Sequence, residues 1–364
     1  MYNANALKLG FFGSNCSSGR YVTTVAERWP ATWDDNVRLA LLLDEAGMDF
    51  FLPIARWKGY GGEADYHGST FETLTWAAAM LAITKRLTIF GTVHVPLFSP
   101  LIAAKQMATA DHAGHGRFGL NVVCGWNEDE FEMFGVKPVD YAARYRQGQE
   151  WLDLVKMIWE RDDFDFSGEF YRVKGVREKP KPYGGSNPLV MNAGVSGDGR
   201  DFALRNCNAW FTSIRQSLAT NEGLAEATRL VHATKGEARA LGRELSVYTS
   251  GMLICRPTRR EAEEYRHYVT VEHADRTAIE RMLAMKGQVG LPPDELARLS
   301  DTIASGKGSL PLCGTPDDVV DILARASAAG IDGVALSLVN EIDEFPYFRA
   351  EVLPRLERLG LRKP

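Results

Sequence analysis

The chain has 364 residues, a hydrophobic content of 45% and a formal net charge of −5, which allow one large core. It contains no run of basic residues, which argues against a nucleic-acid partner, and its longest apolar stretch, at 74–83, is shorter than the roughly 20 residues of a membrane span. The N-terminus has no basic segment and the five cysteines are scattered without a CxxC motif, so we predict no signal peptide, no disulfide framework and a cytoplasmic location.

Short apolar runs alternate with longer helical patterns along the chain. Predicted strands cover 7–13, 49–54, 87–93, 117–123, 188–193, 208–213, 245–254 and 331–339. Predicted helices cover 34–47, 70–84, 99–114, 141–160, 223–242 and 315–330. The strands are apolar at nearly every position, as expected for strands that are covered on both faces. This alternation predicts an α/β fold, a (β/α)8 TIM barrel that forms a single domain over 1–364.

Two features qualify this prediction. A doubly wound open sheet is the competing fold, but its GxGxxG motif is missing from the segment "GSNCSSGR" that follows the first strand. Residues 274–314 form a long insertion between the predicted seventh and eighth strands, with short amphipathic helices and a Gly/Ser-rich tail. Long loops in compact domains are often lids, so we expect either a lid or a surface excursion without a role.

Polar side chains follow several of the predicted strands. Active sites of TIM barrels lie at the carboxyl ends of the strands, so these side chains are candidates for a ring around the site. Aromatic residues would form its walls. The strand-end candidates are Leu52, Thr92, His94, Asn121, Cys124, Trp126, Asn192, Ser213, Asn340 and Glu341, and the aromatic ones are Trp57, Tyr60, Phe98 and Trp126.

Three of these positions have a structural interpretation as well as a functional one. His94 could bind a metal, but no HxH or HExxH motif accompanies it, so a structural histidine is favoured and no metal site is predicted. Cys124 could be a nucleophile, but a small buried thiol is favoured. The acidic residues at 128–132 could form an acid/base pair, but most of them suit the solvated first turn of a helix.

The segment "AGVSGDGR" at 193–200 lies between a predicted strand and a helical pattern. Its glycines, Gly194, Gly197 and Gly199, allow a ligand to approach the backbone closely. The N–H groups at the start of the following helix could then bind a phosphate. Together with Arg144 and Arg146 in "ARYR", this turn predicts a cofactor that carries a phosphate.

Several longer stretches resemble the bacterial luciferase-like, reduced-flavin-dependent monooxygenases. The resemblance covers about residues 8–357 and rests on "KGYGG", "SPLIAAKQMATADHAGHGRFGLNVVCGW", "RYRQGQEWL", "FSGEFYRV", "KPKP" and "LCGTPDDVVDILARASAAGIDGVALS". The chain is most similar to the branch that contains the pyrimidine oxygenase, the dimethylsulfone monooxygenase and the alkanesulfonate monooxygenase. This resemblance implies a barrel of the bacterial luciferase type that receives reduced FMN (FMNH2) from a separate NAD(P)H-dependent flavin reductase and uses O2 as cosubstrate.

The resemblance also implies roles for individual residues. The positions that match flavin contacts in the family are Ala55, Arg56, Asn121, Glu130, Arg144, Tyr145, Gly194 and Ser196. A small oxygen pocket in this branch matches Leu52, Thr92, Asn121 and Trp126, which are our candidate catalytic residues, and the branch is thought to form a flavin N5-peroxide rather than the usual C4a-peroxide. The chain departs from the family pattern at Cys124, where Thr or Ser is common, and in its phosphate loop.

The pocket residues predict the substrate only as a class. Trp57, Tyr60, His94, Phe98 and Cys124 suggest a partly aromatic pocket for a small neutral or weakly polar molecule, such as a heterocyclic amide or a sulfone. We therefore expect a two-component FMNH2-dependent monooxygenase that forms a homodimer or homotetramer. Two alternatives stay open: a deazaflavin (F420)-dependent oxidoreductase on the same fold, and a flavin-binding relative without catalysis.

Overall fold

The computed structural model describes residues 1–137, 139–214, 217–306 and 308–363. Contacts within the chain divide it into two compact units. The first unit comprises Met1–Phe71, Ser213–Ala233 and Tyr248–Pro364, and the second comprises Glu72–Thr212 and Thr234–Val247. The expectation of a single domain over 1–364 therefore stays a prediction, and each unit is described by itself.

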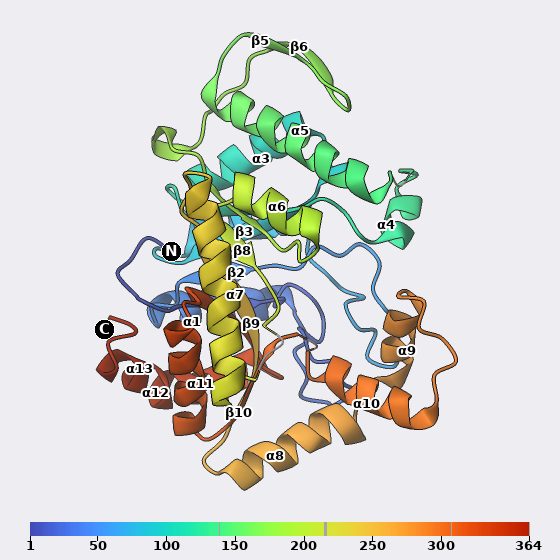
Figure 1. Cartoon of the computed structure of the whole chain (residues 1–364), viewed down its shortest axis with the longest axis vertical. Helices are drawn as coiled ribbons and strands as arrows, with labels where there is room; N and C mark the ends of the chain where they lie inside the picture. Colours follow the sequence, from blue (N-terminus) through green and yellow to red (C-terminus); the bar gives the residue numbers. More distant parts are fainter. Residues whose placement is uncertain (138, 215–216, 307, 364) are drawn as a thin grey trace. The chain divides into compact units, whose positions relative to one another are not determined.

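The first unit is built on parallel strands (Figure 1). Their order is β10 (Leu310–Gly314), β9 (Ser246–Cys255), β11 (Gly333–Ser337), β1 (Lys8–Phe12) and β2 (Phe50–Leu52). Its helices are α1 (Trp33–Glu45), α8 (Arg259–His267), α9 (Arg276–Ala284), α10 (Pro293–Ala304), α11 (Pro316–Ala328), α12 (Glu341–Glu351) and α13 (Leu353–Arg358), and a π-helical turn covers Tyr268–Glu272. Helix α7 (Asn221–Ala240) has residues in both units.

Local sequence explains where several of these helices begin. Thr32 caps α1 by accepting a hydrogen bond from the Asp35 backbone N–H, and acidic residues occupy the first turn. Helix α11 begins with a capping box in which the Thr315 and Asp318 side chains each accept from the other's backbone N–H. Pro316 follows the cap at the first helical position, where a missing N–H costs nothing.

The second unit contains the parallel strands β3 (Thr88–His94), β4 (Phe118–Val123), β7 (Leu189–Asn192) and β8 (Ala209–Phe211). Its α-helices are α2 (Thr73–Ile83), α3 (Pro100–Ala113), α4 (Glu128–Met133), α5 (Tyr141–Glu160) and α6 (Gly197–Asn206), and short 3-10 turns cover Val95–Leu97 and Tyr183–Gly185. A two-stranded antiparallel ribbon, β5 (Phe164–Ser167) and β6 (Arg172–Val176), follows α5 (Figure 1). The Glu150 carboxylate of α5 accepts hydrogen bonds from three backbone N–H groups of the turn at 169–171 and so fixes the ribbon.

Each of the eight predicted strands overlaps an observed one, and the six predicted helices are also present. The sequence patterns missed the β5–β6 ribbon and strand β10, which lies inside the predicted insertion at 274–314. The rest of the insertion is mainly α9 and α10, and these helices have a hydrophobic core of their own. Its buried members include Ile279, Leu283 and Ile303, which form one cluster with Val22 and Tyr66 of the first unit.

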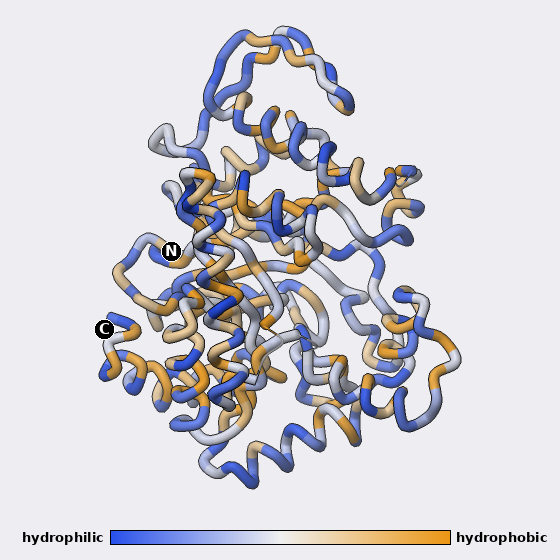
Figure 2. Tube along the Cα trace, in the orientation of Figure 1, coloured by the Kyte–Doolittle hydropathy of each residue, from blue (hydrophilic) through white to orange (hydrophobic). Residues whose placement is uncertain are grey.

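Hydropathy differs sharply among the helices. Helix α8 is mostly hydrophilic in Figure 2 and buries Ala262 alone, whereas α2 is apolar along most of its length and buries six residues. Within the part of the chain that the structure describes, none of the helices combines the length and the apolar character needed to cross a membrane.

Candidate active site

Thr92 and Asn121 occupy paired positions on the neighbouring strands β3 and β4 of the second unit. Asn121 Nδ2 donates a hydrogen bond to Thr92 Oγ1 at 3.2 Å, and both residues are buried. The backbone carbonyl of Thr92 accepts from the Thr73 hydroxyl of α2 at 2.6 Å, which anchors this end of β3. Asn121 Oδ1 is buried and has no hydrogen-bond partner among the described residues. A buried amide oxygen in that state is costly, so a ligand or a water molecule is its natural partner.

His94 and Glu130 form a second buried pair in the same unit. His94 ends β3, and Glu130 lies in the short helix α4 that follows β4. Their closest atoms, His94 Nδ1 and Glu130 Oε2, are 3.6 Å apart, and both side chains are almost inaccessible to solvent. The sequence predicted neither this pairing nor the burial of an acid in such an acidic turn. In the described part of the chain, no group of three His, Cys, Asp or Glu side chains is arranged to hold a metal ion.

The turn after β7 holds the predicted phosphate loop. Ser196 is the N-cap of α6, and its hydroxyl accepts a hydrogen bond from the Gly199 N–H at 3.1 Å. Asn192 fixes the start of the turn, because its Nδ2 donates to the Val122 carbonyl and its Oδ1 accepts from the Gly194 N–H. Gly194 and Gly199 approach so closely that a Cβ on Gly194 would lie 2.6 Å from the Gly199 Cα. The backbone is therefore packed as a tight cradle at the start of a helix.

Two predicted cofactor residues lie on α5. A Cβ added to Gly199 would come within 2.5 Å of the Tyr145 hydroxyl, so the phenol lies directly at the glycine turn. Arg144 is mostly buried, and it pairs with the exposed Glu128 of α4 at 2.8 Å and donates to the Val139 carbonyl. Glu128 is therefore bound to Arg144 and is not simply solvated, as the sequence suggested.

Cys124, Trp126 and Phe98 have different environments. The Cys124 sulfur faces α5, where a Cβ on Gly148 would lie 2.4 Å away, and burial raises the pKa of this thiol well above its usual range. This environment favours the inert buried thiol over a nucleophile. The Trp126 side chain is 45% exposed, so it shields a site from water only once a ligand covers it. The Phe98 carbonyl accepts a hydrogen bond from the Trp151 indole of α5 at 2.8 Å.

A further group of predicted residues belongs to the first unit and lies at the end of β2 or in the segment after it. Leu52 and Ala55 are buried, and the Arg56 guanidinium lies over the Tyr60 ring at 4.9 Å. Trp57 and Tyr60 are partly exposed. Asn15 pins the segment through a two-way hydrogen bond with Ile54, and Arg281 of α9 donates to the Tyr60 carbonyl at 3.1 Å.

Two side chains of the first unit were overlooked in the sequence, Arg20 and His67. Arg20 follows the small residues of "SSG" and His67 precedes Gly68 and Ser69, so a cation and an imidazole beside small residues were the available signal. Glu341, which the sequence placed in the polar ring, is completely buried at the first position of α12.

Several known proteins are similar to this chain. Residues 7–333 match the family model described as luciferase-like monooxygenase. An FMNH(2)-dependent dimethylsulfone monooxygenase of Pseudomonas fluorescens (strain Pf0-1) is 28% identical, over 97% of this chain and 95% of that protein. The pyrimidine monooxygenase RutA of Variovorax paradoxus (strain S110) is 26% identical, over 93% of this chain and 87% of that protein.

Among solved structures, DmoA from Hyphomicrobium sulfonivorans superposes with a TM-score of 0.83 and 17% identity, over 98% of this chain and 89% of that one. At this identity the likeness concerns the fold. It confirms the predicted α/β fold with an eight-stranded parallel β-barrel of the luciferase type.

Proposed function

The chain belongs to the luciferase-like monooxygenase family, and from this premise we propose that it is the oxygenase component of a two-component system that uses FMNH2. A separate NAD(P)H-dependent reductase would supply the reduced flavin, and one atom of O2 would enter a small organic substrate. The names of the relatives support this proposal, since one is an FMNH(2)-dependent dimethylsulfone monooxygenase and another a pyrimidine monooxygenase.

The residues of the second unit fit such a flavin. The cradle of Gly194 and Gly199, capped by Ser196, presents backbone N–H groups of the kind that bind phosphate. Tyr145 lies at that cradle. Arg144, the preceding residue of α5, pairs with Glu128, and we propose its phosphate contact on the strength of the family pattern. The single phosphate of FMN suits one such cradle. We propose the same binding role for Ala55, Arg56 and Glu130, on the strength of the family pattern.

The flavin supplies the redox chemistry with O2 when it is bound, and the protein supplies position and hydrogen bonds. Asn121 is the observation that carries this proposal, because its buried Oδ1 has no partner among the described residues and its Nδ2 is fixed by Thr92. A carboxamide held in this way can bind a flavin edge with one atom and orient a neighbouring hydroxyl with the other. The Thr92 hydroxyl can then donate to an oxygen atom on which negative charge develops.

Water exclusion is the second task of the site, because a reduced flavin that meets O2 in a wet site releases hydrogen peroxide. We propose that Leu52 and Trp126 exclude water once ligands are bound. The insertion at 274–314 would assist as a lid, through the contact of Arg281 with the Tyr60 carbonyl. Deleting 286–308 is a poor test, because the deletion would remove buried residues of α10 such as Leu299 and Ile303. Arg281→Ala is the sharper variant, and we expect it to raise the fraction of O2 that ends as peroxide.

The substrate would be a heterocyclic amide or a sulfone, bound near Trp57, Tyr60, His94, Phe98 and Cys124. A deazaflavin-dependent oxidoreductase and a flavin-binding protein without catalysis are the alternatives. Anaerobic photoreduced FMN, followed by rapid mixing with air and a panel of substrates, separates the three. An oxygenase gives oxygenated product with FMN, a deazaflavin enzyme reacts with its own cofactor without O2, and a binding protein gives peroxide alone.

The phosphate contacts allow a direct test that does not depend on the substrate. Ser196→Ala and Arg144→Ala should each weaken the binding of reduced FMN by about 1.5–3 kcal/mol, the usual value of a charge-assisted hydrogen bond. Arg205→Ala is the matched control, because Arg205 lies on the same helix α6 but pairs at the surface with Asp201. If both Ser196→Ala and Arg144→Ala bind reduced FMN as tightly as wild type, these residues do not contact the phosphate.

A further inference from the structure

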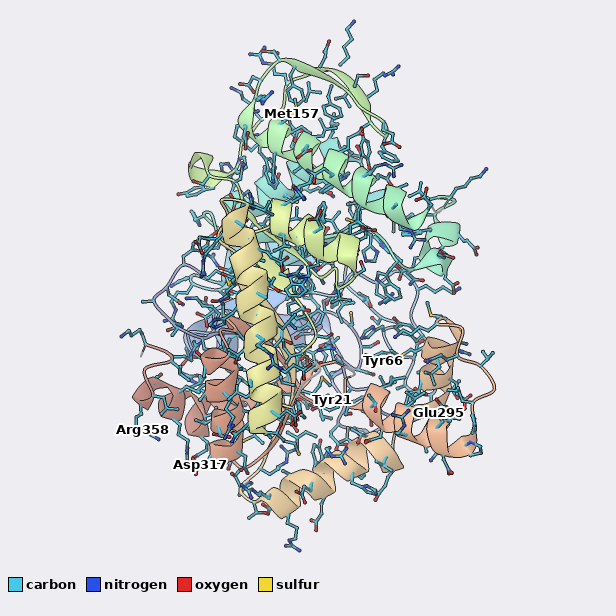
Figure 3. All side chains as sticks on the ribbon, viewed as in Figure 1. Tyr21, Tyr66, Met157, Glu295, Asp317 and Arg358 are labelled. Atoms are coloured by element: carbon cyan, nitrogen blue, oxygen red, sulfur yellow. The ribbon has the colours of Figure 1, made fainter. Side chains whose placement is uncertain are left out.

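Arg20 is an unusual cation in the loop that follows β1 of the first unit. Burial is the main cause that lowers the pKa of its guanidinium, although an arginine remains protonated in proteins. The side chain nevertheless keeps part of its surface accessible. Its Nη1 reaches Ser309, a residue that lines a pocket, so Arg20 lies next to that pocket without being part of its wall. The phenols of Tyr66 and Tyr21, both labelled in Figure 3, are close enough to affect the pKa of this guanidinium.

The contacts of Arg20 leave its charge uncompensated. Its Nη1 donates to Ser309 Oγ at 3.1 Å, and the guanidinium lies over the Phe12 ring at 4.7 Å. No carboxylate of the described residues pairs with it. Desolvating a cation without an anionic partner is strongly unfavourable, so proteins rarely keep one at such a position unless a ligand uses it.

A histidine near Arg20 adds no further positive charge. Burial and the guanidinium groups of Arg56 and Arg20 lower the pKa of His67 to about 3, so the imidazole is neutral at physiological pH. Its Nε2 lies 2.6 Å from the Gly19 carbonyl, and its ring stacks on Tyr66 with 3.9 Å between centroids. Burial, the largest cause, together with the two guanidinium groups therefore excludes a positive charge on this imidazole.

Two hydroxyl groups extend the polar surface beyond Arg20. Ser309 Oγ lies 2.7 Å from Ser250 Oγ, and Ser250 is on the buried face of β9. Ser309 also lines a pocket of about 350 Å³, with Tyr21, Met252 and Gly308 among its other walls. This volume is within the range of small-molecule sites. Among the described residues of this pocket, Arg266 and Asp301 form an ion pair at 2.9 Å and so neutralise each other.

We propose that Arg20, with the hydroxyl groups of Ser250 and Ser309, binds an oxyanionic group of the substrate, a carboxylate or a sulfonate. The planar guanidinium suits two oxygen atoms of such a group, and the hydroxyl pair donates to a further one. The inference rests on the proposed oxygenase function and narrows its substrate class. The substrate then carries a negative charge away from the group that is oxidised, which the sequence-based expectation of a neutral molecule did not include.

Binding of matched probe pairs tests this directly. Benzoate with benzamide, and benzenesulfonate with methyl phenyl sulfone, differ within each pair mainly in charge. Titration calorimetry on the full chain should show tighter binding of the charged member, by at least tenfold, in one pair or in both. The pair with the larger preference identifies carboxylate or sulfonate as the preferred group.

The Arg20 variants decide whether this residue is responsible. Arg20→Met should abolish the charge preference, Arg20→Lys should keep part of it, and Ser309→Ala should reduce it about threefold. Arg349→Met is the matched control, since Arg349 is a partly exposed arginine of the same unit that pairs with Glu45. If Arg20 only holds the loop of Ser309, Arg20→Met weakens the charged and neutral probes equally, and the proposal is wrong. It is also wrong if the wild-type protein prefers the neutral members.

A separate measurement keeps this inference distinct from the proposed function. Reduced FMN binding and O2 uptake are measured in the same variants, in the absence of any probe. If the wild-type protein does not bind reduced FMN, the oxygenase assignment is wrong, and the proposed substrate class is wrong with it. Normal flavin binding together with an unchanged charge preference in Arg20→Met and Ser309→Ala would overturn the inference alone. If Arg20→Met fails to fold, Arg20→Lys and Ser309→Ala give the same decision.

Discussion

The two units differ in whether their buried polar side chains have partners within the protein. In the second unit, buried polar groups lie close to complementary ones: Asn121 Nδ2 donates to Thr92 Oγ1, although Asn121 Oδ1 has no partner among the described residues, and His94 Nδ1 lies 3.6 Å from Glu130 Oε2. In the first unit, Arg20 and Glu341 are desolvated without a partner of opposite charge among the described residues. Hydrogen-bonded or ion-paired side chains fix each other's positions. Side chains without such a partner remain able to bind a ligand. We infer that the paired groups of the second unit are held in place before a ligand binds, whereas Arg20 of the first unit remains able to bind an anion.

Glu341 shows how strong the contrast is. Its side chain is fully buried, and neither oxygen makes a hydrogen bond of normal geometry with a described residue. Burial raises the pKa of this carboxyl to about 8, and the adjacent Ser14 hydroxyl offsets only part of that effect. The group is therefore mostly a neutral acid at pH 7, able to donate a hydrogen bond as well as accept one.

The largest expected effect concerns the paired groups of the second unit. Asn121→Ala and Thr92→Val should still fold and bind flavin, but product formation should fall by about a hundredfold or more. The reason is that donors placed where charge develops are typically worth about 3–4 kcal/mol each. Product per bound reduced flavin is measured in single turnover, with the melting temperature recorded beside it.

The competing explanation is that the pair serves the rim of the barrel alone. Thr92→Val would then lower the melting temperature while turnover per bound flavin stays normal. Thr75→Val is a suitable control, because Thr75 is an exposed threonine on α2 of the same unit. Leu52→Tyr adds a test from the first unit, since filling the predicted oxygen pocket should cause the same loss of product.

The next effect is on stability, and it concerns the unpaired acid. Because the pKa of Glu341 is raised to about 8, the folded protein holds a proton that the unfolded chain releases near pH 4.5. The stabilisation by this group is thus complete below pH 4.5 and is lost as the pH rises through 8. Glu341→Gln removes this dependence, so the variant should become more stable than wild type above pH 7, by about 2–4 kcal/mol at pH 9.

Urea unfolding at pH 5, 7 and 9 measures this difference. Asp343→Asn is the control, since Asp343 is an exposed acid in the same first turn of α12. An equal free-energy difference between Glu341→Gln and wild type at the three pH values would show that Glu341 is charged in the folded protein. Of Arg20 and Glu341, only Arg20 would then remain an example of an unpaired buried group in the first unit.

The sequence predicted the barrel because the strands are continuous in apolar residues, and it predicted that Thr92 and Asn121 meet because adjacent parallel strands align their ends. It did not predict β10, which is short and carries an exposed Pro311 inside a region that is otherwise helical. Nor did it predict the charge state around Arg20, because the lack of a partner depends on how distant loops pack. Periodicity reports which face is buried, and it carries no information on which polar groups remain unsatisfied there.

The smallest expected effect tests whether pairing in the second unit contributes to stability. Glu130 is buried beside His94, and Glu128, two residues earlier on α4, is 64% exposed and pairs with Arg144. Glu130→Gln keeps the volume but removes the charge, and it should destabilise the protein by about 1–2 kcal/mol, since a buried interaction with a charged group is lost. Glu128→Gln should cost at most about 1 kcal/mol, because exposed ion pairs contribute little.

The salt dependence of the two variants sharpens this comparison. Screening by 1 M salt weakens exposed pairs and leaves buried ones nearly intact. The destabilisation by Glu128→Gln should therefore vanish at high salt, whereas that by Glu130→Gln should persist. If both vanish together, the Glu130 carboxylate is screened like a surface group, and the 3.6 Å approach to His94 contributes nothing to stability. The second unit would then resemble the first, with a buried acid held for a ligand rather than for the fold.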